Sequence, residues 1–259
     1  MPAVVTRKNQ ADIRDPAVKN TFINGINAFN SLSTSRGEIG GSYGTLVAIH
    51  RHPHKFHSAD GDVGTQRFLT WHRVYLSVLE FWVSSIPNYQ NFYIPYWDWT
   101  VDRNIPNWLQ NFKPHVNIPN TESIPPTPSS VEPVDVSRTP PPPGQDGEFS
   151  LPTENKIKDC LRKPTYTEFT MTLEGLHADV HAWVGGTMRD LLTSPADPLF
   201  WMHHANIDRI YTSWREQHAD NSDTIPILSG LDLNMDPWAG TEPEYRHWDW
   251  VAYDKLITV

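Results

Sequence analysis

The sequence predicts a mainly α-helical protein with little β-structure, in which four histidine-bearing helices form a bundle. Two observations carry this prediction. Apolar residues recur at helical spacing in several long segments, and histidines fall in or beside these segments in two groups, one in each half of the chain. The chain has 259 residues, enough for a sizeable core, and we expect one domain over residues 1–259.

The predicted helices follow in order along the chain. Residues 14–32 place apolar side chains three or four positions apart. Residues 45–57 form a histidine-rich helix or helix end, which Pro53 should kink or terminate. The strongest predicted helix spans residues 66–86, and two more follow at residues 165–182 and 197–218.

A proline-rich region separates the two halves. Residues 113–152 include the run Pro140–Pro143, and proline both lacks an N–H donor and restricts its neighbours. We therefore expect a surface insertion or linker without a packed helix or sheet. Tyr93–Trp99 forms an aromatic cluster before it, and residues 241–259 are expected to form a short strand or an aromatic plug.

Composition excludes several classes of function. The net charge of −9 argues against nucleic acid as a partner. No run approaches 18 apolar residues, so we expect no membrane span. The single cysteine, Cys160, excludes an intrachain disulfide. The N-terminal residues lack the apolar segment of a signal peptide, which favours a cytoplasmic location. The sequence does not indicate an oligomeric state.

A metal site is predicted in the second half. His177 and His181 are four residues apart, so on a helix they share one face and can bind one ion. A third imidazole from the following helix would complete the site. The adjacent residues His203 and His204 point about 100° apart, so only one can face the ion, and we predict His204.

The first half offers a second set of histidines. Its members are His50, His52, His54, His57 and His72. Two sites of three imidazoles each suggest a pair of ions. Sites built from imidazole alone suit copper, and also zinc or iron.

These motifs resemble those of tyrosinases and the wider type-3 copper proteins, which include catechol oxidases and molluscan haemocyanin units. Phe68-Leu-Thr-Trp-His72-Arg73, followed by Glu80, is similar to the motif at the first copper of the family. Pro95-Tyr-Trp-Asp-Trp99 is similar to a second family motif. His177-x3-His181 and the later Asp197-Pro-x-Phe-x2-His-His204-x3-Asp208-Arg209 resemble the second-copper motif.

The resemblance implies two copper ions with O2 as co-substrate, and a set of ligands. These would be His50, His57, His72, His177, His181 and His204. One position departs from the family pattern, because Val63 stands nine residues before His72, where relatives carry the middle ligand of the first copper. His57 is our choice to replace it, and His54 is the alternative.

The resemblance also implies a reaction. The expected enzyme oxidises o-diphenols to o-quinones and hydroxylates tyrosine-like monophenols, and this activity is associated with melanin formation. In relatives a glutamate and an asparagine hold a water that removes the phenol proton. The asparagine position is Ala178 here, and the glutamate would be Glu174, with Glu168 as the alternative. Leu191 at the entrance, with Phe200 and His203, would belong to the substrate pocket, and Phe200 would pack beneath the metals.

The resemblance further implies structural ion pairs and alternative functions. Arg73, Asp208 and Arg209 should brace the ligand helices, and Arg7 should meet Tyr253. The alternatives are a catechol oxidase without monophenolase activity and a haemocyanin-like O2 carrier. Haemocyanin units usually carry a further β-rich domain, and because the sequence stops at Val259 we expect an enzyme. A zinc hydrolase or di-iron protein is a third class, since Glu174-x-x-His177 resembles a di-iron motif.

Overall fold

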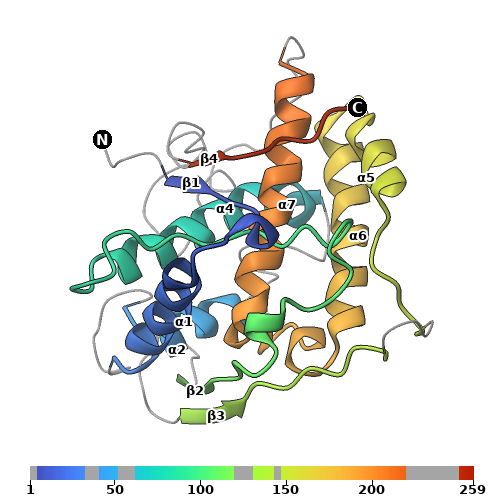
Figure 1. Ribbon diagram of the computed structural model, residues 1–259. Coiled ribbons are helices and arrows are strands. Elements are labelled where there is room, and N and C mark those ends of the chain that lie inside the picture. The colour runs from blue at the N-terminus through green and yellow to red at the C-terminus, as the bar shows by residue number, and fades with distance from the viewer. Residues whose placement is uncertain (1–4, 33–40, 52–61, 120–130, 143–146, 220–250) are drawn as a thin grey trace.

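The computed structural model describes residues 5–32, 41–51, 62–119, 131–142, 147–219 and 251–259, and it is mainly helical, as the sequence predicts (Figure 1). Its α-helices are α1 (Pro16–Asn30), α2 (Tyr43–His50), α4 (Asp62–Ser84), α5 (Glu154–Leu161), α6 (Tyr166–Val184) and α7 (Pro198–Gln217). Helices α2, α4, α6 and α7 carry the predicted histidines. The predicted helical core is therefore confirmed.

Helix α7 passes through the middle of the molecule, with α4 and α6 packed against it (Figure 1). It begins where Asp197 accepts a hydrogen bond from the Leu199 N–H at 2.9 Å and Pro198 occupies the first helical position. Residues 198–211 are all buried, so α7 has no solvent face along most of its length. Its histidines are consequently held inside the core.

Helix α2 is short and completely buried. Ser42 and Thr45 form a capping box at its start, with each side chain bonded to the backbone N–H of the other residue. Gly44 faces the Asn117 carbonyl so closely that an added Cβ would lie 2.0 Å from that oxygen. The helix ends at His50, whereas the predicted segment runs to residue 57; residues 52–61 lie outside the described part of the chain.

Two distant segments pair as parallel strands. Strand β1 (Val5–Arg7) pairs with β4 (Val251–Tyr253), with Arg7 opposite Tyr253. The Arg7 Nη1 donates to the Tyr253 hydroxyl at 2.9 Å. The predicted contact between these two residues, and the predicted strand near residue 251, are both confirmed.

The proline-rich region needs a correction. We expected no packed sheet in residues 113–152, but β2 (His115–Pro119) and β3 (Val131–Asp135) form an antiparallel pair, which lies at one end of the molecule near α2 (Figure 1). Pro133 fits because it lies in an outer strand of a two-stranded sheet, where a missing N–H can face away from the partner. The buried Val116 and Ile118 side chains join the main core.

Helix α5 begins directly after the proline-rich region, and our sequence analysis did not predict it. Its start is capped by Thr153, whose hydroxyl accepts from the Lys156 N–H. Ile157, Cys160 and Leu161 form its buried face at the spacing expected of a short amphipathic helix. Burial raises the pKa of the Cys160 thiol to about 12, which makes it an inert core residue. Among the described residues, no helix has the length and apolar character needed to cross a membrane.

Candidate metal centre

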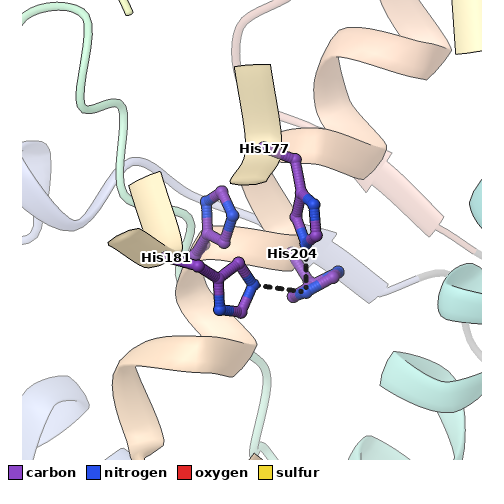
Figure 2. A group of neighbouring side chains, drawn as sticks. His177, His181 and His204 are labelled. Atoms are coloured by element: carbon purple, nitrogen blue, oxygen red, sulfur yellow. Dashed lines mark hydrogen bonds between the residues drawn. The ribbon is translucent and has the colours of Figure 1, made fainter. Parts of the chain in front are cut away.

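Three imidazoles from α6 and α7 converge on one point. His177 and His181 lie one turn apart on α6, and His204 approaches from α7 (Figure 2). The Nε2 atom of His204 lies 3.1 Å from Nε2 of His177 and 3.3 Å from Nε2 of His181. Three ring nitrogens directed at one another in this way form the donor set of a metal ion, since imidazole nitrogen is its common ligand.

Hydrogen bonding fixes the orientation of one of these rings. The His181 Nδ1 lies 2.7 Å from the Met188 carbonyl oxygen. Because a carbonyl can only accept, Nδ1 carries the proton and Nε2 presents its lone pair to the convergence point. Met188 lies in the 3-10 helix Gly186–Arg189 that directly follows α6, so the chain immediately beyond the ligand helix orients the ligand.

Burial keeps these rings neutral. It lowers the pKa of His177 and His204 well below the ordinary value of 6.5, and that of His181 to about 4. A neutral imidazole has a free lone pair for a metal, whereas a protonated one has none. The site is therefore ready to bind a cation at neutral pH.

His203 lies beside this group, but its ring is hydrogen-bonded to Trp99. It belongs to the cluster of four histidines whose nitrogens lie within 4.8 Å of one another. Its Nδ1, however, accepts a hydrogen bond from the Trp99 indole N–H at 3.0 Å. Since one nitrogen of a neutral ring must carry the proton, the proton of His203 is on Nε2, and neither nitrogen keeps a free lone pair for a metal. This arrangement supports His204 as the ligand.

The histidines of the first half lie directly across from this group. The His50 Nδ1 lies 2.9 Å from the Leu191 carbonyl, and the His72 Nδ1 lies 2.8 Å from the Phe68 carbonyl. Both rings therefore present Nε2 as the metal-binding nitrogen. The His50 and His72 ring centroids are 5.7 Å apart, and the His72 ring stacks on His204 at 4.2 Å. The two histidine groups are therefore adjacent.

The third ligand of this half stays a prediction. His57, its alternative His54, and His52 lie outside the described residues. The same holds for the side chain of Val63.

A cavity of about 200 Å³ opens over the two histidine groups. It is lined by His50, Phe68, His72, His177, Ala178, His181, Ala182, Met188, Arg189 and Leu191. Leu191 and Ala178 therefore occupy the places at the cavity that the sequence indicates. Phe200 and His203 were expected in the same pocket but are fully buried and are not among these lining residues.

Phe200 packs against histidines of both groups, which agrees with its expected place beneath the metals. Its ring centroid is 5.1 Å from that of His50 and 4.1 Å from that of His204. It therefore fills the space between the two histidine groups on the side away from the cavity.

Neither Glu174, our choice to hold a water, nor its alternative Glu168 is among the described residues that line the cavity. Glu168 occupies the first turn of α6, where its Oε2 accepts from the Thr165 hydroxyl at 2.9 Å and its N–H donates to the same hydroxyl. It is exposed and stabilises the helix start. Glu174 is partly buried and lies one turn before His177, but it is not among the residues that line the cavity.

Buried ion pairs hold the ligand helices together, as predicted. Arg73 on α4 donates to Asp208 on α7 at 2.5 Å, and Arg209 pairs with Asp98 at 3.0 Å. Arg7 adds bonds to Glu80 at 2.8 Å and to Asp208 at 2.9 Å. These side chains contact one another, and none of them is among the described residues that line the cavity.

Three supporting residues were missed from the sequence. Trp99 fixes His203, and Arg138 forms a buried ion pair with Asp197 at 2.6 Å that holds the start of α7. Arg189 lines the cavity. The Trp99 and Arg138 contacts join residues 104 and 59 positions apart, so no local pattern could indicate them.

A larger cavity of about 650 Å³ lies next to the proline-rich segment. It is lined by Arg103, Trp183, Phe149 and neighbouring prolines, and no histidine is among its described lining residues. The smaller cavity, whose lining includes the histidines, is therefore the candidate active site.

Comparison with known proteins agrees with this geometry. A family model described as the common central domain of tyrosinase matches residues 40–217. The chain is similar to a tyrosinase of Streptomyces lincolnensis, with 30% identity over 281 residues that cover 93% of this chain and 94% of that protein.

Two solved structures share the fold. One is a tyrosinase from Burkholderia thailandensis, with a TM-score of 0.72 and 18% identity, where the match covers 98% of this chain and 74% of that one. The other is a functional unit of Octopus hemocyanin, with a TM-score of 0.69 and 21% identity, where 98% and 69% are covered.

Proposed function

The chain belongs to the tyrosinase family, and from this we propose that it is a dicopper phenol oxidase, which uses O2 to oxidise o-diphenols to o-quinones. The observation that carries the proposal is the convergence of three Nε2 atoms, from His177, His181 and His204, next to His50 and His72. Proteins of this family bind two copper ions, and a donor set made only of imidazoles fits copper.

The residues divide into two ligand sets. His177, His181 and His204 would hold one ion. His50 and His72 would hold the other with a third histidine from residues 52–61, for which we propose His57 over His54. When bound, the copper pair supplies the electron transfer between the phenol and O2.

The chain itself supplies orientation and protection. Carbonyls of Leu191, Phe68 and Met188 fix the rings of three ligands, so little reorganisation is needed when metal binds. Phe68 lines the cavity beside His177, with ring centroids 4.9 Å apart. A phenol entering the cavity therefore meets an aromatic wall on one side and imidazoles on the other.

We also propose hydroxylation of monophenols, as a weaker activity than diphenol oxidation. A monophenol must lose its proton near neutral pH, where a free phenol is overwhelmingly protonated. Ala178 lines the cavity and offers no hydrogen-bonding group to hold a water there. Glu174 remains the proposed proton acceptor, acting through a water from one turn along α6.

The test measures copper per chain after reconstitution, together with O2 uptake on catechol. We expect two ions and catechol-dependent uptake for the unmodified protein. His204→Ala should lose one ion and all oxidation, whereas the neighbouring His203→Ala should retain two ions, because His203 bonds to Trp99. One ion in the unmodified protein, or full activity in His204→Ala, would refute the assignment.

The same measurements separate the alternatives. His57→Ala should retain about one ion, and two retained ions would transfer the role to His54. Reversible O2 binding without catechol oxidation would identify an oxygen carrier. Hydrolytic activity with bound zinc would identify a zinc hydrolase, and iron bound in place of copper would identify a di-iron protein.

A further inference from the structure

One permanent charge lies at the cavity over the histidines. The lining residues in the described part of the chain include a single group that is charged at all ordinary pH values, the Arg189 guanidinium. The other lining side chains are apolar or are imidazoles, and no aspartate or glutamate is among them. Arg189 is therefore the one described lining residue that can bring a permanent charge to a molecule bound in the cavity.

The backbone under Arg189 is firmly held. Gly185 and Gly186 leave α6 with positive φ angles of 65° and 54°, a conformation that glycine adopts without strain. The Thr187 N–H then donates to the Ser137 carbonyl at 2.9 Å, and the Ser137 N–H donates to the Thr187 hydroxyl at 2.9 Å. The position of Arg189 relative to His181 is thus fixed by this turn, which also provides the Met188 carbonyl.

The guanidinium itself has no carboxylate partner among the described residues. Its Cζ lies 5.2 Å from the centroid of the ring of Phe149, a residue that lines the neighbouring larger cavity, and this cation–π contact leaves its charge unneutralised at the rim of the cavity over the histidines. The adjacent Asp190 is occupied, because it accepts from the Leu192 N–H at 2.9 Å and from the Thr193 hydroxyl at 3.1 Å. The charge of Arg189 is therefore available to a ligand.

We propose that Arg189 is a specificity-determining residue, which selects phenolic substrates carrying a carboxylate or a similar anionic group. This inference rests on the proposed phenol oxidase function. An anion on the side chain of the phenol would pair with the guanidinium, which suits a planar carboxylate geometrically. An ammonium group would meet the same positive charge with no carboxylate to bind it.

The test uses three catechols that differ only at the end of a two-carbon chain. They are 3-(3,4-dihydroxyphenyl)propionate, 4-ethylcatechol and dopamine, which are anionic, neutral and cationic. We expect kcat/KM of the copper-loaded protein to favour the anion over the cation. Arg189→Gln should reduce that ratio by about fivefold, the effect of roughly 1 kcal/mol expected for a partly exposed ion pair.

Matched variants separate charge from shape. Arg189→Lys retains the charge and should keep part of the preference. Arg162→Gln removes an exposed arginine paired with Asp159 on α5, and should leave the ratio unchanged. The preference of the unmodified protein should weaken as ionic strength rises, whereas that of Arg189→Gln should not. An unchanged ratio in Arg189→Gln would overturn the proposal.

A binding measurement keeps this test independent of turnover. Calorimetry of the copper-loaded protein with 3-phenylpropionate and 2-phenylethylamine, which carry no phenol hydroxyl, should show tighter binding of the anion and its loss in Arg189→Gln. Failure to oxidise 4-ethylcatechol would sink the oxidase function alone. Equal binding of the two phenyl compounds would sink the role of Arg189 alone.

Discussion

The contact of Arg7 with Glu80 and Asp208 gives a quantitative prediction about stability. In Arg7→Met the Asp208 carboxylate keeps Arg73 and the Tyr253 hydroxyl, at 2.5 Å each. Glu80, which is 4% exposed, keeps only the Ile94 N–H at 3.0 Å among the described residues. The variant thus leaves one buried carboxylate uncompensated, which costs about 3 kcal/mol in the free energy of unfolding.

Urea unfolding at pH 7, followed by tryptophan fluorescence, measures this loss, and the slope against urea should stay unchanged. Tyr253→Phe removes one buried hydroxyl from the same network and should cost about 1–2 kcal/mol. The control is Lys255→Met, which breaks an exposed pair with Asp12 joining the same two segments of the chain, and should have little measurable effect. If Arg7→Met cost no more than Lys255→Met, the reasoning from burial would be wrong.

Three further predictions concern the site. The pKa of His181 is about 4 in the folded protein, against an ordinary 6.5, so the unfolded chain binds more protons below pH 6.5. The free energy of unfolding of the metal-free protein should therefore fall by up to about 3 kcal/mol through this residue as pH falls from 6.5 to 4. Urea unfolding across this pH range measures the loss, and His181→Gln should lack it. Ala178→Asn should raise the ratio of monophenol to diphenol oxidation by placing a hydrogen-bonding group at the cavity, and an unchanged ratio across several phenols would count against a water held there. Gly186→Ala should destabilise the protein by at least about 2 kcal/mol, because φ is 54° and the new Cβ would lie 2.3 Å from the Ser137 carbonyl. Gly175→Ala, inside the preceding helix α6 with nothing within 4 Å, should instead stabilise it by about 0.5 kcal/mol in thermal unfolding.

The ligand helices could be predicted because their information is local. The four-residue spacing of His177 and His181 places both on one face of α6, and helix geometry alone separates His204 from its neighbour. The structure adds the reason for that separation, which is the indole of Trp99 bonded to His203. That contact joins residues 104 positions apart and leaves no trace in a sequence pattern.

The proline-rich region could not be interpreted in the same way. Its proline content correctly indicates a segment without α-helix among its described residues, but proline density does not exclude an edge strand, and β2 and β3 form there, with Val116 and Ile118 in the main core. The buried pair of Arg138 with Asp197 then connects this region to the start of α7. Its role in supporting a ligand helix depends on tertiary packing alone.

The pairing of β1 with β4 has a consequence for the order of events during synthesis. Val251–Tyr253 is made almost 250 residues after its partner Val5–Arg7. Until then the Arg7 guanidinium lacks the Tyr253 hydroxyl, and the edge of β1 has no strand beside it. The ion pairs that brace the ligand helices need no residue beyond Arg209, whereas the β1–β4 pairing needs a segment more than 40 residues further along the chain, so the helices can be braced before this strand pair closes over Arg7.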